Sequence, residues 1–352
     1  MASNRVYYAV QRATLCPCAA NGNNDTQKTT AGYVSSLVQS VGITTSLEYE
    51  QLFELGRLQI FENVEGLPSI EVTLERAIGI YPGADSATID AFTKDGTLWN
   101  VCANDAAGGT NTFTTAASRR FNIAMVTADD DSKNSHGSVS ATGMYLSNYS
   151  LNIGVEGPAT ESVTLVGNSC EWQSGLLKLP SKGTYESGIL SNDVGPDSSA
   201  SGIIQRKHLT SASFGLGGLQ SLSFSVSFDR EDLLQLGNKF PYFKAAGFPV
   251  ETTLELESIA DKQSKGFNFN ERLDPNTGEN KCDIGGKLTN ASIKAGNRTF
   301  TFGTMNWTGT SKSGGDAGGG NQTITDSYVG YNSYSVGINT EWTAIDNACN
   351  AE

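Results

Sequence analysis

The chain has 352 residues, with 39 glycines, 9 prolines and a formal net charge of −13 at pH 7. Such an excess of carboxylates repels phosphate, so we do not expect duplex nucleic acid to be a tight partner. The N-terminus lacks the apolar core of a signal peptide, and no apolar run is long enough to span a bilayer. We therefore expect a protein that is made in the cytoplasm and stays soluble, at least at first.

Residues 1–35 are predicted to be an N-terminal arm that begins with a strand at Arg5–Gln11 and continues as a polar stretch. From Val38 onward, apolar and polar residues alternate, as in a half-buried strand, and the same alternation returns at Ile70–Glu75. This pattern predicts a long hairpin with one apolar face and one face of hydroxyl and carboxyl groups. Between its strands, Glu50–Gly56 is predicted to form a short helical turn closed by a left-handed glycine.

Further strands are predicted after the hairpin, at Phe121–Thr127, Tyr145–Glu156 and Glu161–Gly167. Apart from the turn above, only Ser86–Phe92 looks helical. Residues 176–210 are rich in Gly, Ser, Pro and Asp and are predicted to be a linker.

The hairpin returns in the second half of the chain. Gln39-Ser40…Leu55-Gly56 aligns at constant offset with Gln220-Ser221…Leu236-Gly237, and Gly66 and Pro68 fall on Gly247 and Pro249. After a one-residue deletion, Glu71, Thr73 and Glu75 fall on Glu251, Thr253 and Glu255. Glu231–Gly237 therefore predicts a second helical turn. Strands are expected to follow at Leu288–Lys294, Thr299–Phe302 and Tyr331–Ile338.

An internal repeat shows how many structural units a chain contains. Here it predicts two homologous domains, residues 36–175 and 211–352, because a chain of this length can form two cores. The alternative is chance similarity between two strand–loop–strand units. The expected fold is mainly β, with two tandem sandwich or barrel domains, each with a long hairpin and a short flanking helix.

Catalytic and metal-binding motifs are weak. His136 and His208, the two histidines of the chain, lie in polar segments without a nucleophile elbow, and solvated surface histidines are the favoured interpretation. Asp129-Asp-Asp131 lacks the ligand spacing of a calcium loop, and the glycine runs lack the Lys-Ser/Thr of a phosphate loop. We expect no enzyme activity, no cofactor and no metal.

The six cysteines are expected to be free thiols in a reducing cytoplasm. Cys16-Pro-Cys18 has no histidine nearby and spacing too tight for a zinc site. Cys16, Cys18 and Cys349 lie near the chain ends, where they are candidates for disulfides between subunits.

The alternation supports two interpretations of the polar face of the hairpins equally: it is the solvent side of an ordinary sandwich, or it is the wall of a channel. A long hairpin edge invites pairing, and closing the sheet across several subunits removes the edges. The channel-lining candidates are Ser40, Thr44, Ser46, Glu48, Glu71, Thr73, Glu75, Ser221, Ser223, Ser225, Ser227, Asp229, Glu251, Thr253 and Glu255.

The repeated Gln-Ser…Leu-Gly…Gly-x-Pro unit and the loop Gly314-Gly-Asp-Ala-Gly-Gly-Gly-Asn321 resemble virion structural proteins of tailed bacteriophages, tail tube proteins in particular. The resemblance implies a β-sandwich or barrel with a protruding hairpin and a flanking helix, arranged in rings of six units that stack into a tube for DNA. With two units per chain, three chains would make a ring. Sheath, baseplate and neck proteins are the partners that it implies. The long insertions at 77–120 and 259–285 depart from a minimal tube domain.

Two alternatives remain. One is a capsid decoration or collar protein. The other is a carbohydrate-binding adhesin, which needs an exposed aromatic platform; its candidate residues are Trp307, Tyr328, Tyr331 and Tyr334.

Overall fold

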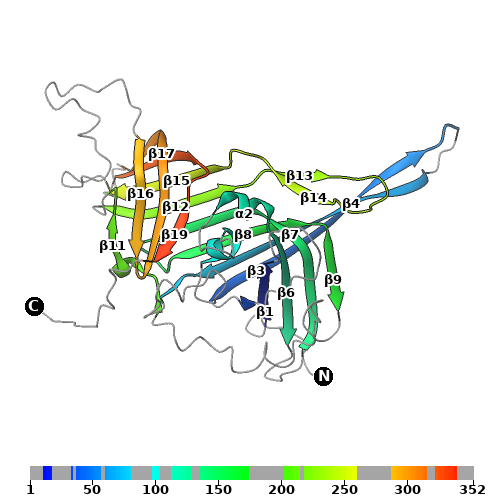
Figure 1. Cartoon of the computed structure of the whole chain (residues 1–352), viewed down its shortest axis with the longest axis horizontal. Helices are drawn as coiled ribbons and strands as arrows, with labels where there is room; N and C mark the ends of the chain where they lie inside the picture. Colours follow the sequence, from blue (N-terminus) through cyan, green and yellow to red (C-terminus); the bar gives the residue numbers. More distant parts are fainter. Residues whose placement is uncertain are drawn as a thin grey trace, which may run out of the picture.

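A computed structural model describes residues 11–17, 33–34, 37–56, 60–80, 97–103, 112–128, 135–173, 202–214, 218–259, 287–314 and 322–338. The protein is mainly β, as predicted from the sequence, with a large antiparallel sheet and the two short helices α1 and α2 in the described part. Figure 1 shows a body of long strands from which one hairpin projects far outward.

The first half of the chain contributes one set of strands and both helices. In the sheet, neighbouring strands follow the order β3-β4-β8-β7-β6-β1. The elements are β1 (Gln11–Pro17), β2 (Tyr33–Val34), β3 (Val38–Phe53), β4 (Ile60–Ala77), β5 (Gly79–Ile80), α1 (Leu98–Ala103), α2 (Phe113–Ser118), β6 (Arg120–Ala128), β7 (Ser135–Gly154), β8 (Thr160–Gly167) and β9 (Ser169–Gln173).

The second half has the neighbour order β12-β15-β18-β17-β16-β11. Its elements are β10 (Gly202–Ile203), the 3₁₀ turn η3 (Arg206–His208), β11 (Leu209–Ala212), β12 (Leu219–Ser227), β13 (Arg230–Leu233), β14 (Phe243–Ala246), β15 (Glu251–Ile259), β16 (Lys287–Ala295), β17 (Arg298–Ser313), β18 (Thr323–Tyr331) and β19 (Ser335–Ile338). The strands expected after the hairpins are present, except that the one expected at Tyr331–Ile338 is interrupted: β18 ends at Tyr331 and β19 begins at Ser335.

The strand order is repeated between the halves, and so are its irregularities. β7 pairs first with β9 and then with β8, and β17 pairs first with β19 and then with β18. Each long strand changes partner near a glycine of positive φ, Gly143 (67°) and Gly303 (70°). The next register shift falls between Leu146 and Asn148 in β7 and between Trp307 and Gly309 in β17. Bulges are built features of a strand, so their shared position supports duplication over chance similarity.

The structure corrects the alignment of the returning strand. Val41 of β3 lies opposite Leu74, and its counterpart Leu222 lies opposite Leu256 rather than Leu254. The repeat therefore needs a one-residue insertion, and the predicted one-residue deletion is wrong. Glu75 corresponds to Glu257, not to Glu255. The polar alternation is unchanged because a slip of two residues keeps every side chain on its face.

The predicted helical turns at Glu50–Gly56 and Glu231–Gly237 are also wrong. β3 continues to Phe53 and β13 to Leu233, and each reaches a hairpin tip. Gly56 and Gly237 at these tips have φ of 89° and 88°, so the predicted left-handed glycines are confirmed. The tip pairing repeats as well: Glu50 lies opposite Val64 and Glu231 opposite Ala245. Ser86–Phe92, also predicted to be helical, lies outside the described residues.

Short segments at the edges of the predicted domains also have defined places. Residues 11–17, inside the predicted N-terminal arm, form β1 and pair with β6. Residues 202–210, inside the predicted linker, include β10, which pairs with β5 of the first half.

An aromatic cluster joins the two halves in the core. Tyr334, which precedes β19, is 4 % exposed and lies 5.1 Å from Trp99 of α1 and 4.3 Å from Phe224 of β12, measured between ring centroids. Its hydroxyl lies 3.2 Å from that of Tyr149 in β7. Such contacts give the two halves a shared core.

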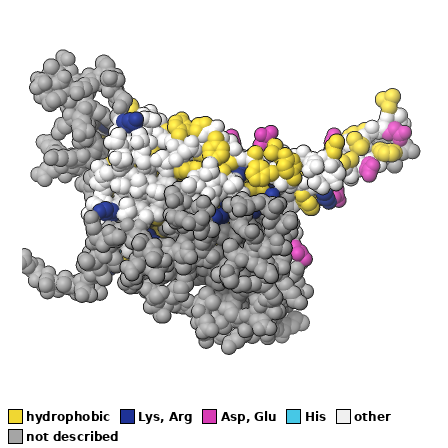
Figure 2. Space-filling view, in the orientation of Figure 1, with side chains coloured by type: hydrophobic (Ala, Val, Ile, Leu, Met, Phe, Trp, Pro, Cys, Tyr) yellow, Lys and Arg dark blue, Asp and Glu magenta, His cyan; other side chains and the backbone are white. Residues whose placement is uncertain are grey.

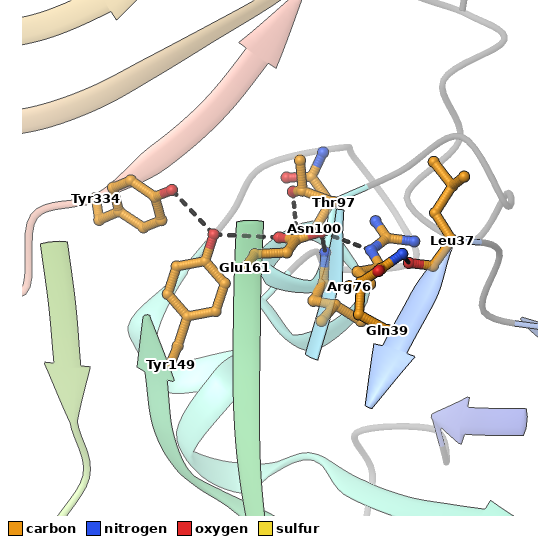
Figure 3. A network of polar contacts seen from close by, with 9 residues as sticks. Leu37, Gln39, Arg76, Thr97, Asn100, Tyr149, Glu161 and Tyr334 are labelled. Carbon is orange, nitrogen blue, oxygen red and sulfur yellow. Dashed lines mark hydrogen bonds and ion pairs between the residues drawn. The ribbon is translucent and has the colours of Figure 1, made fainter. Parts of the chain in front are cut away.

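Beside this cluster lies a buried polar network (Figure 3). Glu161 of β8 is fully buried, and its Oε1 accepts hydrogen bonds from Arg76 Nε at 2.7 Å and from the Leu98 amide at 2.8 Å. Its Oε2 accepts from the Tyr149 hydroxyl at 3.2 Å. Burial raises the pKa of Tyr149 and Tyr334 well above the usual value, so both hydroxyls stay protonated and available as donors.

Candidate assembly surface

One continuous sheet runs through both halves because β7 pairs with β12. It contains the strands β3-β4-β8-β7-β12-β15-β18-β17 in that order. β15 shows how the two faces of this sheet differ: Thr252, Leu254 and Leu256 are buried on one face, while the alternate side chains are exposed or half-buried on the other. We call the exposed side of these eight strands the polar face.

The predicted channel-lining residues lie on this polar face or on the hairpins that extend it. None of the fifteen is buried: twelve are exposed, and three, Ser221, Ser225 and Thr253, are half-buried. Register places Ser40, Glu75, Ser162, Ser150, Ser225 and Thr253 side by side across six strands. That these residues line a channel stays a prediction.

Hydroxyl and carboxyl groups on the polar face are bonded to one another across the strands. Ser40 donates to Glu75 at 3.3 Å, and at the corresponding place in the second half Ser221 donates to Glu257 at 3.0 Å. Both pairs join the first strand of a half to its returning strand, so the bond is repeated with the fold. Glu257 was missed in the sequence because the alignment was two residues out of register.

The polar face extends beyond the residues that the sequence singled out. β7 and β8 add Asn148, Ser150, Asn152, Ser162 and Thr164, and β17 and β18 add Gly309, Ser311, Ser313, Thr325 and Ser327. The alternation in Thr160–Gly167 was visible in the sequence, but not which neighbours these strands would have. No lysine, arginine or histidine stands among these named positions of the face, whereas Glu71, Glu75, Glu251, Glu255 and Glu257 do.

The two hairpin tips carry exposed apolar side chains, which the sequence analysis did not predict. Leu55 and Leu236, each beside a tip glycine, are 103 % and 100 % exposed. Figure 2 shows apolar side chains gathered along the projecting arm and over the neighbouring surface. The large exposed apolar residues of the two hairpins are Leu47, Tyr49, Leu52, Phe53, Leu55, Phe61, Val64, Leu234, Leu236, Phe240, Tyr242 and Phe248. Exposed apolar patches of this kind are typical of protein–protein and membrane interaction sites, ligand-binding grooves and aggregation-prone surfaces.

The second hairpin lies on the first half of the chain, whereas the first hairpin projects (Figure 1). Arg230, at the base of β13, donates from Nε to the Leu146 carbonyl at 2.8 Å, and its guanidinium lies 5.3 Å from the Tyr145 ring centroid. Desolvation lowers the pKa of Arg230 to about 10, which still leaves it charged at neutral pH. Phe243 of β14 meets the Tyr145 ring edge-on at 5.6 Å.

The aromatic platform proposed for an adhesin is not formed. Tyr328 and Tyr334 are each 4 % exposed and belong to the core, and Trp307 is half-buried with its Nε1 donating to Thr310 and Asp326. Of the four candidates, Tyr331 is the one with an exposed ring.

The described cysteine side chains are Cys102 and Cys170, and both are free thiols. Burial raises the pKa of the Cys102 thiol to about 12. Of the disulfide candidates, Cys18 and Cys349 lie outside the described residues, and of Cys16 only the backbone, in β1, is described.

The histidines differ from the prediction of two surface loops. His136 lies within β7. His208 ends the turn η3, is half-buried, and accepts a hydrogen bond from the Gln205 amide at its Nδ1, 3.1 Å away. Desolvation lowers its pKa.

Within the described ranges, no group of three or more His, Cys, Asp or Glu side chains is arranged to hold a metal ion. In the part of the chain that the structure describes, no helix is long and apolar enough to cross a membrane. A comparison with models of known protein families finds no match. A search of curated proteins also finds none.

Proposed function

We propose that the chain is a structural subunit of a bacteriophage tail tube, and that three copies close into a ring of six similar units around a DNA channel. The observation that carries the proposal is the repeated strand order within one continuous sheet. Two similar units already stand side by side in one chain, joined by β7 and β12. A repeated head-to-tail junction of this kind generates a ring when its rotation closes.

The polar face suits the wall of a DNA channel. Its carboxylates include Glu71, Glu75, Glu251, Glu255 and Glu257, and its named positions hold no cation. A like-charged wall raises the energy of phosphate near it, so DNA slides past without a binding site. Small hydroxyl side chains such as Ser150 and Ser225 keep the wall wet and free of bulky groups.

The exposed apolar hairpins suit contacts between neighbouring units and between stacked rings. The proposal places the protein in the virion tail, with sheath, baseplate or neck proteins as further partners. The burial of Tyr328 and Tyr334 weighs against the adhesin alternative.

The test is electron microscopy of the purified full-length chain over a range of protein and salt concentrations. The proposal predicts rings or stacked tubes with a central channel. Binding to a capsid lattice without self-stacking would instead support a decoration or collar protein. A monomer under every condition would refute the proposal.

A further inference from the structure

The junction between the two halves provides a template for a junction between two copies of the chain. β12 is the counterpart of β3, and β7 is the counterpart of β17. Within the chain, β12 and β7 pair antiparallel from Ser221 opposite Gly154 to Ser227 opposite Asn148. β3 lies at one end of the eight-strand sheet. At the other end, β17 pairs with β16 from Arg298 to Asn306, as β7 pairs with β6 from Ser135 to Tyr145. Pairing of β3 with the following residues of β17 in a second copy would therefore repeat the internal junction.

We propose that β3 of one copy pairs with residues 309–313 of β17 in a second copy, in the register that β12 takes on β7. The inference rests on the proposed ring and specifies which strands and which residues build its interface.

The register follows from landmarks that both halves share. In β7 the register shift lies between Leu146 and Asn148, and in β17 it lies between Trp307 and Gly309. Asn148 and Gly309 therefore occupy equivalent positions, and so do Ser150 and Ser311. Val41 lies opposite Leu74 and Leu222 lies opposite Leu256, so Val41 and Leu222 occupy equivalent positions. Three residues further on, Thr44 is equivalent to Ser225. Since Ser225 lies opposite Ser150 within the chain, Thr44 is expected opposite Ser311 of the second copy.

The side chains of this predicted junction are compatible. Ser46 falls opposite Gly309 and Gly42 opposite Ser313, so small residues meet on the polar face, as Ser223 meets Asn152 inside the chain. In the described part of the chain, β3 pairs with β4 alone. It has sixteen residues and contains neither proline nor lysine, two of the devices by which exposed edge strands avoid pairing.

The junction also accounts for the projecting arm. Inside the chain, the hairpin β13–β14 continues past the β12–β7 junction and lies on the first half, where Arg230 and Phe243 contact the Tyr145 ring. The same arrangement between copies brings the tip of β3–β4 onto the second half of the partner copy. The exposed Phe53, at 68 %, and Phe61, at 59 %, would then be covered.

The register is consistent with a closed barrel. A line of directly paired residues starts at Ser40, crosses β4, β8 and β7, and reaches Ser225 of β12. The residue equivalent to Ser40 in the second half is Ser221, so this line arrives four residues beyond it. Each half therefore contributes four strands and a stagger of four residues. A barrel whose stagger equals its strand number has a strand tilt of about 36°, within the usual range of about 35–45°.

Cysteine pairs test the register in assembled protein. The Val155 amide donates to the Gln220 carbonyl, and the Phe228 amide donates to the Ser147 carbonyl. Hydrogen-bonded and non-hydrogen-bonded pairs alternate along an antiparallel ladder, so Ser225 and Ser150 form a non-hydrogen-bonded pair, in which the Cα atoms are close. Ser225→Cys with Ser150→Cys should therefore form a disulfide within one chain, and serves as the positive control. Thr44→Cys with Ser311→Cys is the test pair, and Thr44→Cys with Ser313→Cys is the control shifted by two residues.

After oxidation with oxidised glutathione, non-reducing electrophoresis and peptide mapping should show the Thr44→Cys–Ser311→Cys disulfide between chains. Its yield should exceed that of the shifted pair roughly tenfold, because diagonal Cα atoms lie about 7–8 Å apart. The wild-type chain, treated in parallel, shows any cross-links made by its own cysteines. If rings form and the internal control closes while the test pair does not, the junction is wrong and the ring stands. If no assembly forms, both the ring and the junction are refuted.

Discussion

Replacement of Glu161 by alanine is expected to destabilise the protein strongly. Glu161 is fully buried and accepts hydrogen bonds from Arg76, the Leu98 amide and Tyr149. Alanine would break the buried ion pair between Glu161 and Arg76, whose side chain is 7 % exposed. Removing one partner of a buried ion pair costs about 3–5 kcal/mol.

The loss of three hydrogen bonds leads to a destabilisation of similar size, because each buried donor left without an acceptor costs about 1–3 kcal/mol. The assay is urea unfolding of the wild type, Glu161→Ala and Glu255→Ala, with the free energy of unfolding extrapolated to water. Glu255 is an exposed carboxylate on the same sheet, and its loss should change stability by no more than about 0.5 kcal/mol.

A double variant separates charge from packing. Glu161→Leu with Arg76→Met removes both charges and keeps apolar volume, so it should recover much of the loss. A cost below about 1 kcal/mol for Glu161→Ala, or one equal to that of Glu255→Ala, would refute the reasoning.

Three further predictions concern the core and the tips. Burial raises the pKa of the folded Cys102 thiol to about 12, whereas the same thiol in the unfolded chain has a pKa near 9.0. Its contribution to the free energy of unfolding is therefore complete below pH 9.0 and falls by about 1.4 kcal/mol per pH unit above it. Urea unfolding at pH 8 and 10.5 should show a smaller loss in Cys102→Ala than in the wild type, and an equal loss in both would contradict the prediction. In Gly330→Ala the new Cβ would lie 2.5 Å from Met305 Sδ and should cost about 1–3 kcal/mol in thermal unfolding, while Gly337→Ala, with nothing within 4 Å, should be far milder; equal costs would count against the packing. Leu236→Ser should keep the free energy of unfolding within about 0.5 kcal/mol of the wild type but reduce assembly, measured by sedimentation. A large fall in the free energy of unfolding would show instead that this leucine stabilises the fold.

The sequence predicted the strands and their two faces well because alternation is a local signal. Thr160–Gly167 alternates in burial residue by residue, as its sequence does in polarity. The duplicated hairpin was found for the same reason, since both copies keep their phase.

What the sequence missed depends on pairing between distant residues. The two-residue slip that equates Glu75 with Glu257 leaves every face unchanged, so no local pattern reveals it. Arg76 and Glu161 are 85 residues apart, and their bond exists because β4 and β8 are neighbours. α1, Leu98–Ala103, is buried on all sides and has no amphipathic period to detect.

The hairpin tips were missed for a different reason. Two leucines followed by Leu-Gly resemble the capped end of a helix, yet β13 stays extended to Leu233 because it pairs with β14. Tertiary pairing therefore outweighed the local preference.

The most direct test of the central claim is the number of chains in one ring. Native mass spectrometry of the smallest assembled particle counts copies of the 37.3 kDa chain. Two similar units per chain and a ring of six units predict three copies. Six copies per ring, or a monomer alone under assembling conditions, would contradict the account.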